Sequence, residues 1–148
     1  MDTPEAGGLS GPNPTLRSAG MDDIDAVLDL WRQAGAEPTH TDDGESLQRL
    51  IVHQPGALIV ADSGQQLVGS VIAGWDGWRG SIYRLVVAPA HRRVGLGRRL
   101  LAEAERRLSA MGAVRLQAIV VETDALATAF WQNSGWEQQT ARLRFVRG

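Results

Sequence analysis

The sequence predicts one α/β (α+β) domain built on a mixed, mostly antiparallel sheet with about four helices. Apolar runs of strand length at 57–61 and 67–75 are separated by a short polar stretch, which is typical of a hairpin. A third apolar run, 82–87, leads through a glycine-containing turn into a helical pattern. The apolar run 114–121 follows that helix, and a strand reached through a helical crossover lies parallel to the strand before it.

Two helices are expected before these strands. Residues 15–18 predict a short first strand. The first helix begins near Met21, because Ile24 and Val27 open an apolar stripe at helical spacing. The second helix covers about 45–53 and stops at a Pro-Gly pair.

The chain after 121 predicts one more helix and a last strand. The helix begins at Thr123 or Asp124 and runs to Ser134, and Gly135 suits the left-handed residue that ends a helix. From Trp136 onward, apolar residues alternate with arginines. This alternation predicts a half-buried final strand or hairpin.

Composition bounds the class of protein. A length of 148 residues suits one domain, which we expect at 15–148 behind a flexible N-terminal tail at 1–14. The absence of cysteine excludes thiol catalysis, cysteine-based metal sites and disulfides. No signal peptide or membrane span is visible, so the expected location is the cytoplasm, with no membrane partner.

Charge is unevenly distributed along the chain. Acidic residues concentrate between Asp22 and Glu45, and arginines between Arg84 and Arg115. Two interpretations stay open: a basic side for an anionic cofactor facing an acidic side that attracts an amine, or two solvated helix faces. The net charge of −2 argues against a nucleic-acid partner.

The turn after the third strand has the features of a phosphate site. It reads Arg92-x-x-Gly95-x-Gly97, and a helical pattern begins there. Glycines let the backbone approach a ligand, and the unpaired N–H groups at a helix N-terminus attract anions. Two or three such donors could hold a diphosphate. The dinucleotide fingerprint fails because Leu100 stands where its third glycine belongs, and a chain without lysine has no Walker A loop.

This turn, preceded by Val87-x-Pro89, resembles the acetyl-CoA pyrophosphate loop of the GNAT superfamily of N-acetyltransferases, in its small stand-alone bacterial form. The resemblance implies the GNAT fold, in which a central parallel pair of strands splays apart and the pantetheine arm of acetyl-CoA inserts between them. It also implies the following contacts with acetyl-CoA: Leu85, Val86, Val87, Arg92, Arg93, Val94, Gly95, Leu96, Gly97, Arg98, Asp124, Phe130 and Trp131.

Residues 124–136 keep the spacing of a second GNAT segment and differ from it at two positions. Asp124 replaces the usual asparagine. Trp131 replaces the tyrosine that often protonates the leaving CoA thiolate, and an indole N–H cannot release a proton near neutral pH. Either Trp131 assists by hydrogen bonding alone, or Tyr83, the only tyrosine, supplies the proton. Trp131 is equally well interpreted as a core aromatic residue.

The resemblance further implies direct transfer of an acetyl group to an amine, with the oxyanion held by a backbone N–H near Val87. Arg84 stands at a position where the family often has a glutamate that acts as the general base. The remaining candidates for the base are Glu122, ranked first, then Asp76 and Asp124. Each also has a purely structural interpretation. Glu122 would be a charge favoured at a helix start, Asp76 would form a turn, and Asp124 would cap a helix N-terminus.

Two functions remain open at this point. The first is an acetyl-CoA-dependent N-acetyltransferase acting on a primary amine of a small molecule or protein. The second is a non-catalytic acyl-CoA-binding sensor, which the substitutions at Trp131 and Arg84 favour. No metal is expected, because the three histidines lack ligand spacing. The identity of the acceptor is not predicted, and a homodimer stays open.

Overall fold

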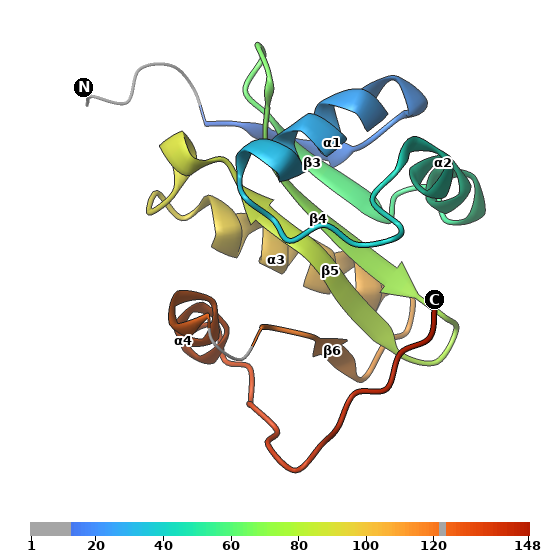
Figure 1. The fold of residues 1–148 in the computed structure, drawn as a ribbon, viewed down its shortest axis with the longest axis vertical. Helices are drawn as coiled ribbons and strands as arrows, with labels where there is room; N and C mark the ends of the chain where they lie inside the picture. The colour runs from blue at the N-terminus through green and yellow to red at the C-terminus, as the bar shows by residue number, and fades with distance from the viewer. Residues whose placement is uncertain (1–12, 122–123) are drawn as a thin grey trace.

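The computed structural model describes residues 13–121 and 124–148 (Figure 1). Its helices and strands are β2 (Thr15–Ser18), α1 (Ile24–Gln33), α2 (Gly44–His53), β3 (Leu58–Asp62), β4 (Leu67–Trp75), β5 (Gly80–Val87), α3 (Leu96–Ala110), β6 (Leu116–Ala118) and α4 (Ala125–Asn133). Short 3₁₀ turns cover Met21–Asp23 and Pro89–His91.

The strands form one sheet in the order β2-β3-β4-β5-β6. Neighbouring strands are antiparallel except β5 and β6, which are parallel. The predicted mixed, mostly antiparallel sheet with a central crossover through a helix is therefore confirmed, as are the four helices among the described residues.

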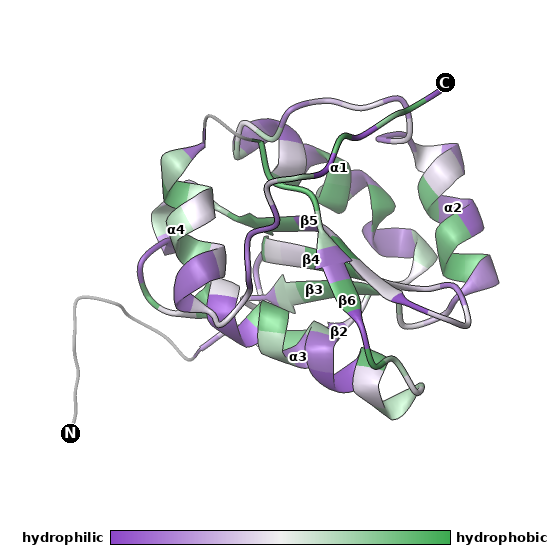
Figure 2. Ribbon diagram, turned by 90° about the horizontal axis from the view of Figure 1, so that it is seen from below, coloured by the Kyte–Doolittle hydropathy of each residue, from purple (hydrophilic) through white to green (hydrophobic). Residues whose placement is uncertain are grey.

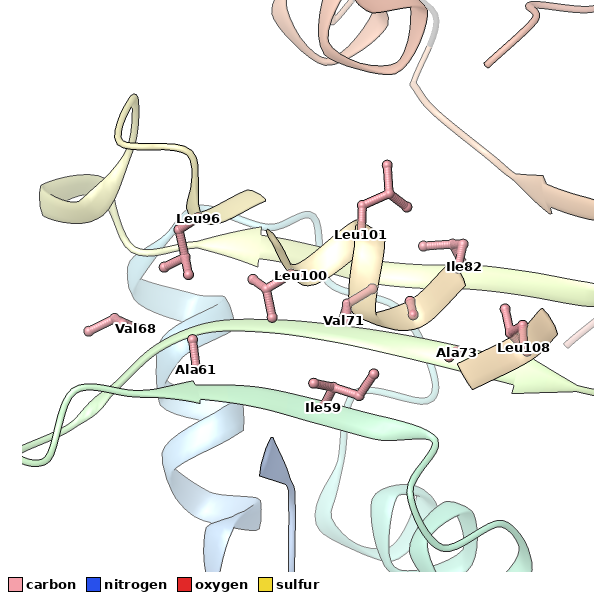
Figure 3. Close-up of a cluster of buried hydrophobic side chains, with 11 residues drawn as sticks. Ile59, Ala61, Val68, Val71, Ala73, Ile82, Leu96, Leu100, Leu101 and Leu108 are labelled. Carbon is pink, nitrogen blue, oxygen red and sulfur yellow. The ribbon is translucent and has the colours of Figure 1, made fainter. Parts of the chain in front are cut away.

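The two faces of the sheet carry separate cores, because successive strand residues point to opposite sides. In β3, Ile59 and Ala61 pack toward α3, whereas Leu58 and Val60 pack toward α1 and α2. Figure 3 shows the first of these clusters, in which leucines of α3 lie against the strands. Its α3 members are Leu96, Leu100, Leu101, Ala104 and Leu108. The other face of α3 is hydrophilic (Figure 2).

An ion-pair network fastens α3 to the start of the sheet. Glu103 accepts hydrogen bonds from Arg106 at 2.6 Å and from Arg107 at 2.7 Å. Arg107 also donates to the Ser18 hydroxyl at 2.9 Å and to the carbonyl of Gly56 at 2.8 Å. The bonds from Arg106 and then Arg107 lower the pKa of Glu103 from 4.5 to about 2.

Replacing this carboxylate (Glu103→Gln) is expected to make stability less dependent on pH. Because the folded-state pKa is depressed, the stabilisation is complete above pH 4.5 and is lost as the pH falls toward 2. Chemical denaturation should show that the free energy of unfolding of the variant is lower by only about 1 kcal/mol near pH 7, because solvent screens this partly exposed pair, and that the difference disappears in acid. Glu45→Gln, on an exposed pair with Arg49, is the control and should change little. An equal deficit at both pH values would contradict the assignment.

Two predictions near the C-terminus need correction. The strand expected at 114–121 is limited to Leu116–Ala118, because its pairing with β5 stops where the strands diverge. The half-buried final strand or hairpin is wrong: residues 136–148 contain no strand, and the side chains of Leu143 and Phe145 are 85% and 89% exposed. Alternating residues give an apolar face, but a strand also needs a neighbouring strand to satisfy its backbone N–H and C=O groups. No described strand pairs with this segment.

Within the described ranges, no helix has the length and hydrophobicity needed to cross a membrane. The division into a tail and a domain at residue 15 remains a prediction. Most of the proposed tail lies outside the described residues.

Candidate functional site

The parallel pair β5–β6 opens along its length. Three pairs join the strands: Gly80 with Leu116, Ser81 with Gln117, and Ile82 with Ala118. Beyond Ile82, β5 continues to Val87 without a ladder partner on this side among the described residues. The predicted splay is therefore present. We use the word gap for this unpaired edge of β5 beyond Ile82, and β6 and α4 lie on that side of β5 (Figure 1).

Backbone N–H groups of β5 point into this gap. The N–H of Ala88 donates to the carbonyl of Val68 in β4 at 2.9 Å. Because N–H directions alternate along a strand, the N–H of Val87 points the opposite way, toward the gap. An extended ligand lying there could pair with β5 as an additional strand would.

A β-bulge interrupts β5 in the middle. Ser70 pairs with Val86 and Ile72 with Tyr83, so the one residue between them in β4 faces two residues in β5, Arg84 and Leu85. Arg84 has a φ of 51°, which is uncommon for a residue other than glycine. The bulge re-aims the backbone where the strands part.

The predicted phosphate loop has the backbone of an anion site. Arg93 and Gly95 both have left-handed φ values, 66° and 84°. The N–H groups at 96–98 open α3, and no described residue accepts a hydrogen bond from them. The side chain of Leu96 is buried in the core, so only its N–H can meet a ligand. The loop thus presents backbone donors at a helix N-terminus.

Gly97 allows three elements to meet at the loop. A Cβ at this position would lie 3.3 Å from Cε1 of Phe130 and 3.8 Å from Cγ2 of Val87. The structure therefore brings together three predicted cofactor residues from α3, α4 and β5. Leu85 and Trp131 pack on the same core cluster, whereas Val86 packs on the opposite side of the sheet.

The arginines of the loop differ in their contacts. The guanidinium of Arg92 donates to the carbonyls of Val87 at 3.0 Å and Ala34 at 3.1 Å, which ties the end of β5 to α1. Arg98 lies 3.5 Å from the carbonyl of Asn133. Arg93 and Val94 are exposed. A role in phosphate binding remains a prediction for these side chains.

Trp131 belongs to an aromatic cluster on α4. Its ring lies 5.8 Å from Phe130 and 4.7 Å from Trp136, both edge-on. Trp136 is anchored to α3 by a hydrogen bond from its indole to Glu105 at 2.8 Å. No described residue accepts a hydrogen bond from the Trp131 indole. Trp131 is thus a packed aromatic residue, and its indole N–H has no acceptor among the described residues.

Two candidates for acid or base chemistry share a pocket of about 180 Å³ beside the bulge. Tyr83 is half-exposed there, with its ring against Gly74. The carboxylate of Asp76 accepts hydrogen bonds from the N–H groups of Arg79 and Trp78, both at 2.7 Å, and these lower its pKa. The full lining is Gln54, Gly74, Trp75, Asp76, Arg79, Ser81 and Tyr83.

Asp124, another candidate for the base, is engaged at the start of α4. Its carboxylate accepts a hydrogen bond from the N–H of Ala127 at 2.9 Å, so Asp124 caps the N-terminus of α4, which is the structural role expected for it as the alternative to a base. Glu122 lies outside the described residues.

Arg84 forms contacts that sequence reasoning missed. Its guanidinium pairs with Asp42, and both side chains are largely buried. It also donates to the carbonyl of Glu37 at 2.8 Å and lies 5.1 Å over the ring of Trp31. Arg84 thereby connects the bulge to the segment between α1 and α2. No local motif signals a pair so far apart in the chain.

Comparison with known proteins agrees with this geometry. The model of the acetyltransferase (GNAT) family matches residues 24–136. An acetyltransferase of Pectobacterium atrosepticum is 30% identical over 122 residues, covering 82% of this chain and 86% of that protein. One from Yersinia pseudotuberculosis is 31% identical over 124 residues, covering 84% and 88%.

A solved structure shows the same fold. It is the PaiA N-acetyltransferase from Thermoplasma acidophilum in complex with coenzyme A, with a TM-score of 0.71, 17% identity, and coverage of 80% of this chain and 86% of that one. The splayed sheet, the loop at α3 and the match over most of the sequence agree, and the chain belongs to the GNAT family of acetyltransferases.

Proposed function

We propose that this protein transfers the acetyl group of acetyl-CoA to a primary amine. The observation that carries the proposal is the gap between β5 and β6. It lies next to the start of α3, where the N–H groups have no acceptor among the described residues. The diphosphate of acetyl-CoA would bind at 94–98, and its pantetheine arm would pair with Leu85 and Val87. The coenzyme A complex of the Thermoplasma acidophilum neighbour supports this choice of ligand.

The bulge would place the thioester for reaction. The amine nitrogen attacks the thioester carbonyl carbon, the C–N bond forms, and the C–S bond breaks with its electron pair leaving on sulfur. Negative charge on the carbonyl oxygen would be stabilised by the N–H of Leu85 or Val87. The proton that the amine loses balances the one that the thiolate gains.

Tyr83 is our candidate for the group that protonates the thiolate. It precedes the bulge, its side chain is accessible, and its hydroxyl can donate a proton, which the Trp131 indole cannot do. Asp76 is the weaker candidate for the base, because two backbone hydrogen bonds stabilise its ionised form. Glu122 stays our first candidate for the base.

Direct measurements separate this function from the alternative of an acyl-CoA sensor. Calorimetry with acetyl-CoA tests binding, and release of free CoA in the presence of small amines, aminoglycosides, amino acids and peptide N-termini tests turnover. Binding with turnover on at least one class of amine supports the enzyme. Binding without turnover on any acceptor favours the sensor, and absence of binding would end both.

Removing the phenol hydroxyl (Tyr83→Phe) is expected to lower kcat by about a hundredfold, the usual size of the effect when an acid catalyst is lost. Affinity for acetyl-CoA should not change, because the ring and its packing on Gly74 are retained. The control is Ser81→Ala, which changes another residue of the same pocket that carries no acid. A wild-type kcat in Tyr83→Phe would return the role to Trp131 or to solvent.

A further inference from the structure

A buried chain of hydrogen bonds ends at the bulge of β5. The indole N–H of Trp31 in α1 donates to the hydroxyl of Ser70 at 2.8 Å. That hydroxyl in turn donates to the carbonyl of Arg84 at 2.9 Å. Ser70 is fully buried and is the one buried polar residue in the described part of the chain. Such a group is kept in a core when its hydrogen bonds specify a local geometry.

The residue at the end of this chain is held from two directions. Its left-handed φ of 51° is sparsely populated outside glycine and persists where the surroundings enforce it. Ser70 holds the carbonyl of Arg84. Asp42 and the ring of Trp31 hold its guanidinium. Trp31 therefore acts on both ends of the same residue, on the guanidinium directly and on the carbonyl through Ser70.

The orientation of that carbonyl determines where the next N–H points. The described residues contain no cis peptide bond, and in a trans peptide the N–H lies opposite the C=O. The Arg84 carbonyl points toward the hydroxyl of Ser70 in β4, so the N–H of Leu85 points away from that hydroxyl, and the side of β5 away from β4 is the gap. Donation to the carbonyl also polarises the peptide, which makes its N–H a stronger donor.

We propose that Ser70 and Trp31 are positioning residues for acetyl transfer. They hold the Arg84–Leu85 peptide so that the N–H of Leu85 donates to the thioester carbonyl oxygen, where negative charge grows as the amine attacks. Neither side chain touches the substrate. This inference rests on the proposed function, because it requires a thioester in the gap.

The test uses acetyl-CoA labelled with ¹³C at the carbonyl carbon. Hydrogen bonding to the oxygen withdraws electron density from this carbon, so binding to the wild type should displace its resonance downfield. Ser70→Ala should bind the probe and lose most of this displacement, and should release CoA to an active amine at least about tenfold more slowly. Ser70→Cys, whose thiol is a weaker donor, should fall between the two.

Two further variants separate positioning from stability. Val27→Ala opens a cavity in the same core and breaks no hydrogen bond, so it should lower the melting temperature and keep the displacement. Trp31→Phe removes the first donor and leaves the Ser70 hydroxyl, so it should reduce the displacement partly. If Ser70→Ala does not fold, the comparison of Ser70→Cys, Trp31→Phe and Val27→Ala decides the question.

The outcomes are distinct. Loss of the displacement in the Ser70 and Trp31 variants but not in Val27→Ala supports the inference. A displacement that survives in those variants, or is absent from wild-type protein that binds the probe, overturns the inference and leaves the proposed function standing. Wild-type protein that does not bind the probe overturns both.

Discussion

Valine in place of Gly97 (Gly97→Val) is expected to abolish acetyl-CoA binding. A Cβ at this position already lies 3.3 Å from the ring of Phe130, and the larger side chain would push α4 away and cover the N–H groups that open α3. Loss of two charge-assisted hydrogen bonds corresponds to at least about a hundredfold in Kd. Calorimetry with acetyl-CoA measures this change directly.

The control for Gly97→Val is Gly20→Val. Gly20 has an extended backbone with φ −103° and lies away from the gap, and a Cβ added there would have only the Asp23 carboxylate nearby, at 3.9 Å. This variant should bind acetyl-CoA as the wild type does. Unchanged affinity in Gly97→Val, with a native circular dichroism spectrum, would refute the assignment of the phosphate loop.

Truncation of Leu100 (Leu100→Ala) is expected to have the largest effect on stability, a loss of about 2–5 kcal/mol. Leu100 is fully buried between α3 and the sheet, where Figure 3 shows it at the centre of the cluster. Urea denaturation would measure the loss. Val52→Ala, which removes an exposed apolar side chain from α2, should change stability little.

A second substitution makes this test sharper. In the wild type, Gly69→Ala would bring a Cβ to 2.8 Å from Cδ1 of Leu100, so it should destabilise the protein. In the Leu100→Ala background the obstructing atom is gone, and the same methyl group fills part of the cavity. The two substitutions should therefore cost less together than the sum of their separate effects. Simple additivity would show that they do not meet in the core.

The order of elements could be predicted from sequence because it depends on local periodicity. Helical spacing defined α1 and α3, and a proline and glycines marked the end of β5 and the start of α3. The glycine-containing turn at the start of α3 could be recognised for the same reason, and its role in binding phosphate stays a prediction. Its N–H groups belong to consecutive residues, and their direction follows from the helix that they begin.

The bulge could not be predicted, because the apolar run at 82–87 reads the same with or without an extra residue. Its presence depends on the register between β4 and β5. The Arg84–Asp42 pair and the Trp31–Ser70 hydrogen bond join separate elements, and neither leaves a pattern in the chain. The strand predicted at the C-terminus failed for a related reason, since alternation reports a possible face and not a partner.

The short ladder between β5 and β6 has a consequence for the folded chain itself. In the described part of the chain, three residue pairs join β6 to β5, and the backbone of β5 beyond them has no strand partner on this side, a partner that a bound pantetheine arm would supply. A ligand that binds only the native state raises the free energy of unfolding, and the gain grows with the ratio of its concentration to its Kd. The lifetime of this protein against unfolding and proteolysis would then follow the supply of CoA thioesters.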